Sequence, residues 1–196
     1  VAQLREQYDA VYISIGAHTD RKVGIEGEDA RGVMSAVEML RGIGDGNLPD
    51  FTGKNVVVIG GGNVAMDAAR TALRLGAEHV YIVYRRSLEE LPARKEEVEH
   101  AMEEGVDFRL LNNPVEILGY HNPDDRRDPK NGCVVGMKCI RMELGEPDEK
   151  GRRRPIPVEG SEFVLDVDTV VIAIGTSPNP LIKSTTKGLD VSKKGG

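Results

Sequence analysis

The chain has 196 residues, of which 39% are hydrophobic and 30% are charged, and its formal net charge is −6. This length suits one ordinary domain, and the acidic balance argues against non-specific nucleic-acid binding. No apolar stretch approaches the ~20 residues of a membrane-spanning helix, so neither nucleic acid nor a membrane is expected as a partner.

The first part of the chain predicts one strand and one helix. An apolar, β-rich run predicts a strand over residues 9–16. Ser35 and Glu38 have the spacing of a capping box, which predicts a helix over residues 35–43. A glycine-rich connector follows, and it leads to a second, more informative region.

That region carries a phosphate-binding pattern. A short β-branched run is followed by Gly60, Gly62 and Ala65 in G-x-G-x-x-A spacing. The predicted order is a strand at 56–59, a helix at 64–75 and a strand at 80–84. This strand–turn–helix–strand context is the one that a dinucleotide-binding fingerprint requires.

Each small residue of the fingerprint has a physical role. Gly60 is expected to make the tight turn, Gly62 to let the backbone approach a pyrophosphate, and Ala65 to allow close helix–strand contact. The unpaired N–H groups at the helix start would face the anion.

The end of the second strand indicates which dinucleotide binds. Arg85 and Arg86 stand about 23 residues after Gly62, where an NAD site usually has an acidic residue. A guanidinium fork matches a 2′-phosphate, so the pattern favours NADP(H) over NAD(H). The alternative is that both arginines are solvated loop residues.

The rest of the chain predicts more of the same domain. A helix at 93–104 and a strand at 107–111 complete a β-α-β-α-β half. Strands at 115–118, 134–144 and 163–167 form an antiparallel meander, and a last buried strand covers 170–174. We predict an α/β, Rossmann-like parallel sheet with helices on both faces and an antiparallel β-meander crossover. The loop residues His121 and Arg152 to Arg154 are expected at solvated hairpin tips.

The two cysteines argue against disulfide chemistry. Cys133 and Cys139 lie in one strand-like run, so extended chain separates them by about 20 Å, whereas a disulfide needs Cα atoms within ~7 Å. We expect two reduced thiols and a cytoplasmic protein. No histidine has the spacing of a metal site or a catalytic triad, so no metal is expected.

These motifs together resemble a known family. The strand end Ser14–Ala17, the fingerprint GGGNVAMD and the strand end Ala173–Gly175 resemble the three landmarks of two-dinucleotide-binding flavoproteins, which are pyridine nucleotide-disulfide oxidoreductase-like. The segments VYRR, LPARKEE, LGEPD, GRRRP, GSEF and AIGTSPN resemble the small (beta) subunit of NADPH-dependent glutamate synthase and its relatives. Those relatives include the bifurcating ferredoxin–NADP oxidoreductase and the flavin-containing part of dihydropyrimidine dehydrogenase.

The resemblance implies a domain division. Residues 1–50 would be a fragment of an FAD domain with a linker, residues 51–176 the NADP(H)-binding domain, and residues 177–196 the return segment toward the FAD domain. FAD is expected in the full-length protein and not in this fragment. The strand predicted within residues 10–16 would then lack its sheet, and the fragment is expected to self-associate through it.

The resemblance also implies a function and a site. The full enzyme would pass hydride from NADPH to FAD, and electrons onward to a partner subunit or an iron–sulfur domain. Backbone N–H groups would hold the pyrophosphate, the arginines the 2′-phosphate, and the last strand end the nicotinamide. The implied cofactor-binding residues are Gly60, Gly61, Gly62, Asn63, Val64, Ala65, Asp67, Arg85, Arg86, Arg94, Ala173, Ile174 and Gly175. None of them is expected to act as a general acid or base.

Some readings stay open at this point. Asp67 matches an acidic position near the nicotinamide carboxamide, but a first-turn acid stabilised by the helix dipole explains it as well. A self-contained dehydrogenase would need a catalytic domain or dyad, for which the chain has no room. A stand-alone NAD(P)-binding sensor or oligomerisation module is the other alternative, and it has no need of the Ala173–Gly175 strand end.

Overall fold

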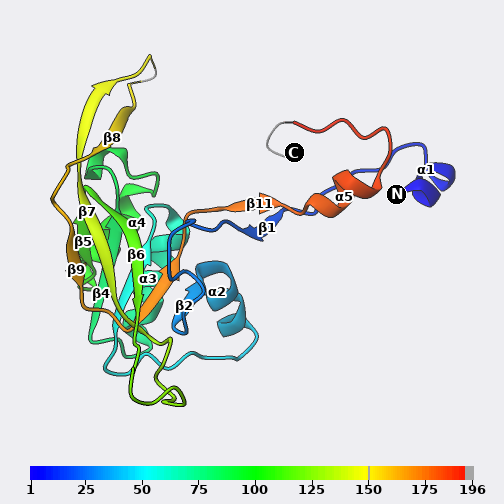
Figure 1. Ribbon diagram of the computed structural model, residues 1–196. Coiled ribbons are helices and arrows are strands. Elements are labelled where there is room, and N and C mark those ends of the chain that lie inside the picture. The colour runs from blue at the N-terminus through cyan, green and yellow to red at the C-terminus, as the bar shows by residue number, and fades with distance from the viewer. Residues whose placement is uncertain (150, 193–196) are drawn as a thin grey trace. The chain divides into compact units, whose positions relative to one another are not determined.

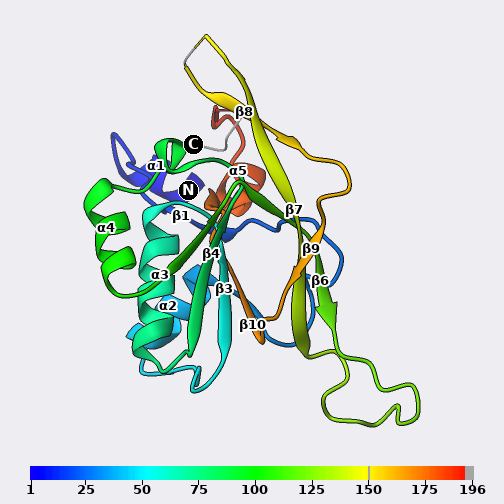
Figure 2. The same ribbon diagram turned by 90° about the vertical axis from the view of Figure 1, so that its left-hand side faces the viewer.

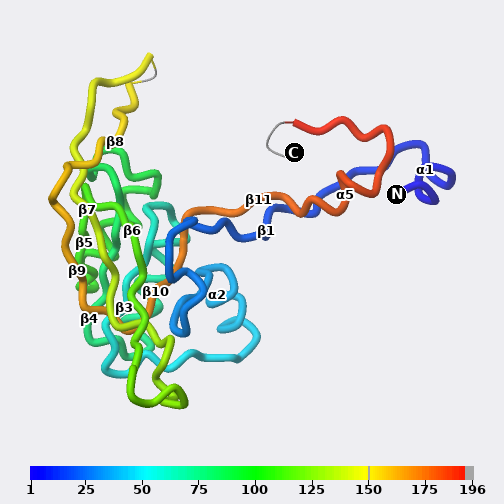
Figure 3. Tube along the Cα trace, in the orientation of Figure 1, coloured from blue at the N-terminus to red at the C-terminus, as the bar shows by residue number. Residues whose placement is uncertain are grey.

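The computed structural model describes residues 1–149 and 151–192, which form two compact units. Lys22–Ile174 make the larger unit, and the smaller one combines Val1–Arg21 with the chain from Gly175 onward. The smaller unit contains helix α1 (Ala2–Gln7), strand β1 (Ala17–Asp20), strand β11 (Thr176–Pro178) and helix α5 (Pro180–Thr185). Its two strands run side by side and antiparallel, as Figures 1 and 3 show.

The strand predicted over residues 9–16 is wrong. Residues 8–16 have no regular secondary structure, and the first strand begins at Ala17, opposite Pro178. A β-rich run becomes a strand only where a neighbouring strand supplies its hydrogen bonds, and no described main-chain bond pairs residues 9–16. Tyr12 in this run is 92% exposed.

The larger unit is built on a five-stranded parallel sheet with the order β2-β10-β3-β4-β5. Its strands are β2 (Val33–Ser35), β3 (Asn55–Ile59), β4 (His79–Tyr84), β5 (Asp107–Leu110) and β10 (Thr169–Ile172). The helices are α2 (Ala36–Gly44), α3 (Asn63–Arg74) and α4 (Lys95–Glu103), with a short 3₁₀ turn, η1 (Leu88–Glu90). The helices predicted at 64–75 and 93–104 are confirmed to within two residues.

Strand β3 shows why this sheet forms. Its sequence NVVVI alternates between two separate cores, since Val56 and Val58 pack with the helices while Val57 and Ile59 pack on the opposite face. A parallel strand that is buried on both faces reads as a continuous apolar run. This strand therefore lies in the middle of the unit.

The second face of the sheet is covered by strands and not by helices. An antiparallel sheet made of β6 (Asn112–Gly119), β7 (Val134–Pro147), β8 (Arg153–Pro157) and β9 (Phe163–Leu165) lies on it. Ile117, Met137 and Cys139 of this sheet join the second core. Figure 2 shows α2, α3 and α4 on one side and β6, β7 and β9 on the other. The Rossmann-like class and the meander are confirmed, but the helices occupy one face only.

The meander also extends further than its apolar pattern indicates. The polar segment that follows residue 144 belongs to a hairpin of β7 and β8, in which Met142 pairs with Pro157 and Pro147 with Arg153. Backbone pairing continues here with polar side chains, because main-chain hydrogen bonds do not depend on side-chain polarity. The hairpin projects beyond the rest of the sheet in Figure 2.

Residues 22–50 pack with the chain that follows them. Strand β2 pairs with β10, and Ala36 and Met39 of α2 are buried in the helical core. Ser35 caps α2, since its Oγ accepts hydrogen bonds from the backbone N–H groups of Val37 (3.1 Å) and Glu38 (3.4 Å). The helix predicted at 35–43 is therefore confirmed, whereas the predicted division at residue 50 does not follow the packing.

Candidate functional site

The fingerprint turn lies at the carboxyl end of the central strand. From β3 the chain runs through α3 to β4 on one side, while β10 pairs with β3 on the other side. The strand order therefore reverses at β3. Ligands of open α/β sheets bind at such a reversal, beyond the carboxyl ends of the strands.

Gly60 is required by a close backbone neighbour. A Cβ added to it would stand 2.3 Å from the carbonyl oxygen of Ala173, and its φ is +146°. The end of β10 is fixed there, because the Ala173 N–H donates to the Ile59 carbonyl at 2.8 Å. Only glycine fits this approach, so the tight turn predicted at Gly60 is at the same time a contact between strand ends.

Gly61 and Gly62 have opposite surroundings. Gly61 is buried, and a Cβ added to it would lie 2.7 Å from Leu91 Cδ2 and 2.8 Å from Tyr84 Cδ2. A Cβ added to Gly62 would have no neighbouring atom within 4 Å, and the φ of −89° at Gly62 suits any residue. The backbone at Gly62 thus borders open space that a Cβ would enter, which is the room that a pyrophosphate needs.

Helix α3 directs unpaired donors toward that space. Its first hydrogen bonds run from the N–H groups of Ala65 (2.9 Å) and Met66 (3.2 Å) to the Gly62 carbonyl. No hydrogen bond among the described residues accounts for the backbone N–H groups of Gly61, Gly62, Asn63 and Val64. Ala65 is fully buried, so the helix packs closely on the sheet, as predicted. Such a helix start is an anion-binding arrangement.

The loop before α4 is hydrogen-bonded to the fingerprint. The N–H of Ala93 donates to the Gly61 carbonyl at 3.1 Å, and the N–H of Arg94 donates to Asn63 Oδ1 at 2.9 Å. Arg94 is the N-cap residue of α4, and its side chain is exposed. The structure thus places the backbone of Arg94 beside the glycine loop, which the sequence did not indicate.

Arg85 and Arg86 both follow β4, but their environments differ. Arg85 is exposed, whereas Arg86 is only 9% exposed. The Arg86 Nε donates to the carbonyl of Arg153 at 3.0 Å, and the Arg86 carbonyl accepts from the N–H of Leu111 at 3.1 Å. Arg86 is therefore not a solvated loop residue.

A network next to these arginines was not predicted. Glu90 accepts hydrogen bonds from the Ser87 N–H (3.1 Å), the Ser87 Oγ (2.5 Å) and Arg153 Nε (2.5 Å). Burial favours the neutral form of Glu90, but these bonds and the Arg153 charge outweigh it, so the pKa of Glu90 is lowered. The S-x-x-E spacing of Ser87 and Glu90 is a capping-box signal that was available in the sequence.

The environment of Arg153 differs from the solvated hairpin tip that the sequence predicts. Instead of lying at a solvated hairpin tip, its side chain is 34% exposed and also forms an ion pair with Glu89 at 2.9 Å. It reaches η1 from the β7–β8 hairpin, which no local pattern of the sequence could show. Its neighbours Arg152 and Arg154 are exposed, as predicted.

The remaining predicted residues are only partly brought together. Ala173 is buried at the end of β10 beside Gly60, and Ile174, the next residue, is 37% exposed. Asp67 lies on an exposed position of α3. Gly175 belongs to the smaller unit. A role of these four residues toward the nicotinamide stays a prediction.

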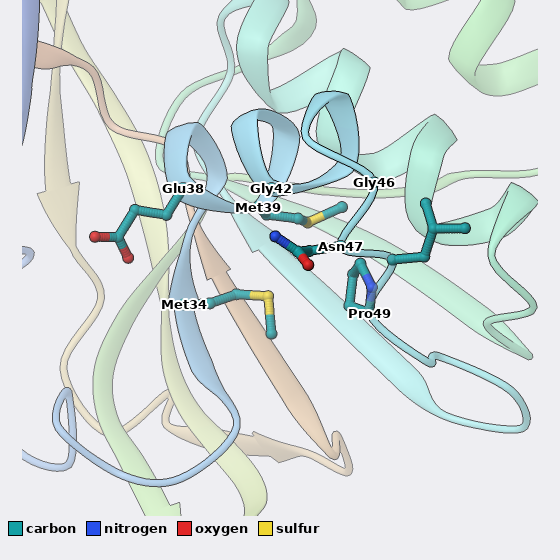
Figure 4. A pocket seen from close by; sticks show the side chains of 8 residues that line it. Met34, Glu38, Met39, Gly42, Gly46, Asn47 and Pro49 are labelled. Carbon is teal, nitrogen blue, oxygen red and sulfur yellow. The ribbon is translucent and has the colours of Figure 1, made fainter.

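An open hollow of about 600 Å³ lies elsewhere, beside α2 (Figure 4). Its lining residues are Met34, Glu38, Met39, Gly42, Gly46, Asn47, Leu48 and Pro49. The lining holds one carboxylate and no cationic side chain, so it offers nothing to the phosphates of a dinucleotide. The glycine loop remains the candidate site.

Within residues 1–149 and 151–192, no group of three or more His, Cys, Asp or Glu side chains could hold a metal ion. In the same residues no helix has the length and apolarity needed to cross a membrane.

Comparison with known proteins gives consistent matches. The chain is 44% identical over 195 residues to the NADP(+)-dependent formate dehydrogenase subunit beta of Moorella thermoacetica, covering 98% of this chain and 26% of that protein. It is 42% identical over 202 residues to the glutamate synthase [NADPH] small chain of Halomonas elongata, covering 98% of this chain and 40% of that protein. The chain thus spans between a quarter and two fifths of these two relatives.

The solved structures agree on the fold. Mycobacterium tuberculosis FprA in complex with NADPH matches with a TM-score of 0.74 and 24% identity, over 97% of this chain and 54% of that one. The resemblance to glutamate synthase small chains inferred from the sequence is confirmed. A family model described as pyridine nucleotide-disulphide oxidoreductase matches residues 2–196, and the chain belongs to that family.

Proposed function

We propose that this chain is the NADPH-binding module of an FAD-dependent oxidoreductase that resembles the glutamate synthase small subunit. In the whole protein, NADPH would give a hydride to FAD, and the electrons would pass to a partner. The residues of this chain would bind and orient the dinucleotide. Its two cofactors would supply the redox chemistry.

The observation that carries the proposal is the glycine loop at the reversal of the sheet. Four backbone N–H groups without a described partner adjoin the open space at Gly62. Arg85 and Arg86 follow the neighbouring strand β4, where a Rossmann-type site holds the adenosine ribose. Backbone donors for a pyrophosphate and guanidinium groups for a 2′-phosphate are therefore present in the order that NADPH requires.

Titration calorimetry of the chain with NADPH and with NADH tests this proposal. We expect NADPH to bind at least tenfold more tightly, which corresponds to ~1.4 kcal/mol, a modest demand for charge-assisted hydrogen bonds to a phosphate. Equal affinities would contradict the NADPH assignment. No binding of either nucleotide would contradict the binding function itself.

The FAD site is proposed for parts of the protein outside this chain. The sequence holds one G-x-G-x-x-G/A fingerprint, which the NADPH site uses. The relatives are named as subunits of larger enzymes, among them a formate dehydrogenase and a glutamate synthase. These enzymes act on different substrates. The proposed partner of this chain is therefore described only by its chemistry, as an electron-transferring subunit or an iron–sulfur domain.

The segment of residues 10–16 is the proposed contact surface of the smaller unit. Tyr12 is 92% exposed, and Ile13 and Ile15 are 36% and 42% exposed. Neighbouring exposed apolar side chains favour contact with another protein surface. We propose self-association of the isolated chain through them. Light scattering would test this by comparing the chain with a variant in which all three residues are changed to serine. An unchanged mass would contradict it.

A further inference from the structure

We infer that Arg153 is a positioning residue for the 2′-phosphate site, and that it thereby helps to set the preference for NADPH over NADH. The inference rests on the proposed function and adds to it a residue from a different sheet. Arg153 acts through its contacts with Arg86 and Ser87, and it does not itself touch the nucleotide.

The first support is that Arg153 holds the arginine of the β4 end. The Nε of Arg86 donates to the carbonyl oxygen of Arg153 at 3.0 Å, and Arg86 is 9% exposed. One nitrogen of the Arg86 fork is therefore fixed by the β8 backbone. That bond restricts the orientation of the whole guanidinium, because the group is rigid and planar.

The second support is that the Arg153 side chain ties β8 to the turn after β4. Its Nε donates to Glu90 Oε1 at 2.5 Å, and its Nη2 donates to Glu89 Oε2 at 2.9 Å. The same Nη2 lies 3.5 Å from Ser87 Oγ. The Glu90 carboxylate is 11% exposed and also binds the Ser87 N–H and Oγ. One arginine thus joins the hairpin to the residues 87–90 by several charge-assisted bonds.

The residues tied to Arg153 also lie at the edge of the sheet where the nucleotide is proposed to bind. Arg85, Arg86 and Ser87 directly follow β4, at the carboxyl end of the sheet where the ribose of a dinucleotide binds. Without the Arg153 side chain, the β8 backbone loses its anchor on Glu89 and Glu90. The Arg86 guanidinium would then sample several orientations, and the bound nucleotide would have to order it again.

Fixing one such side chain on binding weakens affinity by about three- to tenfold. The loss of affinity should affect only ligands that carry a 2′-phosphate. The other phosphates of the nucleotide are proposed to bind to the glycine loop, which Arg153 does not contact. We therefore expect Arg153→Ala to reduce the affinity for 2′,5′-ADP by about three- to tenfold and to change the affinity for 5′-AMP less than twofold. Calorimetric titration of the whole chain with each of these two probes measures the ratio.

Matched variants separate positioning from other effects. Arg154→Ala removes the same charge from the next residue of β8, whose side chain is exposed, and should leave the ratio unchanged. Arg153→Lys keeps the charge but cannot bind Glu89 and Glu90 through a fork, so its ratio should fall as in Arg153→Ala. Urea unfolding of each variant shows whether the chain remains folded, and the lysine variant serves if the alanine variant does not fold.

Four outcomes would overturn the inference. An Arg153→Ala chain with wild-type affinity for both probes would show that Arg153 does not act on the 2′-phosphate site. Equal losses for both probes would indicate a general structural role, and a wild-type ratio in Arg153→Lys would show that charge alone suffices. If the wild-type chain itself does not prefer 2′,5′-ADP over 5′-AMP, then the proposed NADPH preference has failed, and the inference fails with it.

Discussion

Gly60 and Ala173 are 113 positions apart in the sequence, yet a Cβ on Gly60 would stand 2.3 Å from the carbonyl oxygen of Ala173. The contact joins the carboxyl ends of β3 and β10, which are hydrogen-bonded through the Ala173 N–H and the Ile59 carbonyl. The first glycine of the fingerprint and the small residue that ends the last strand are therefore parts of one packing arrangement. This arrangement brings the two strand ends together beside the candidate site.

This contact predicts that Gly60→Ala destabilises the fold. The new Cβ would clash with the backbone of β10, and alanine is strained at a φ of +146°. We expect a loss of about 1–3 kcal/mol in the free energy of unfolding, the usual cost of one strained backbone position. Urea denaturation measures it. A variant as stable as the wild type would show that the two strand ends can separate without cost.

Gly62→Ala is the matched prediction, with the opposite expected result. Nothing lies within 4 Å of the added Cβ, and the φ of −89° suits alanine. The free energy of unfolding should therefore change by less than about 0.5 kcal/mol. NADPH should bind at least tenfold more weakly, because the methyl group occupies the approach of the pyrophosphate. Calorimetry on the folded variant tests this, and unchanged NADPH affinity would place the pyrophosphate elsewhere.

Local pattern was enough to predict the half of the fold that surrounds the fingerprint. Strands β3 and β4 and helix α3 have strong apolar patterns with buried core residues, and each is found within one residue of its expected place. Close packing at Gly61 and Ala65, and close packing with a positive φ at Gly60, also explain why these three positions are small.

Contacts between distant segments could not be predicted in this way. The run at residues 9–16 has the composition of a strand, but composition does not say whether a pairing partner exists, and none is described. Residues 22–50 contain weak signals, yet β2 and α2 pack into the main unit because β10 returns beside them. In both cases the outcome depends on which strand arrives from far along the chain.

In the candidate site, too, the local pattern was predictable and the contacts between distant residues were not. The glycine loop and the two arginines after β4 follow from one continuous pattern. Arg153 was expected to be solvated, because a run of arginines in a polar turn carries no sign of its partners. Glu89 and Glu90 lie more than 60 residues before it, and only the long hairpin brings the three side chains together.

Arg85 and Arg86 should differ in a way that the sequence alone does not suggest. Arg85 is exposed, so Arg85→Ala should weaken NADPH binding by about ten- to a hundredfold, the range for hydrogen bonds to a charged group, with little change in stability. Arg86→Ala should weaken NADPH binding similarly and also lower the free energy of unfolding by about 1 kcal/mol, because the Arg153 carbonyl loses its donor.

Calorimetry and urea denaturation of both variants check this pair of expectations. NADH serves as the control ligand, and its affinity should stay nearly unchanged in both variants because it has no 2′-phosphate. If Arg86→Ala is as stable as Arg85→Ala, the bond to Arg153 contributes nothing to the fold. If NADH weakens as much as NADPH, the two arginines do not recognise the 2′-phosphate.

The buried thiol of Cys139 predicts a loss of stability at alkaline pH. Burial raises its pKa from the ordinary value of 9.0 to about 12, since the thiolate would have to form in the apolar core between the two sheets. In the unfolded chain the thiol ionises near pH 9, while in the folded chain it stays protonated. The contribution to stability is therefore complete below pH 9 and is lost as the pH rises toward 12, by up to about 1.4 kcal/mol per pH unit.

Urea denaturation at several pH values between 8 and 10.5 measures this slope. Cys139→Ala lacks the buried thiol, so its free energy of unfolding should fall less steeply with pH than that of the wild type, although at pH 8 the variant is less stable because a core side chain is truncated. Cys133→Ala is the control, because Cys133 is only half-buried and directly precedes β7, the strand that contains Cys139. The wild type and Cys133→Ala should show the same steep slope. Equal slopes in all three proteins would mean that Cys139 reaches water before the chain unfolds, and that the core between the parallel and antiparallel sheets opens more easily than its packing indicates.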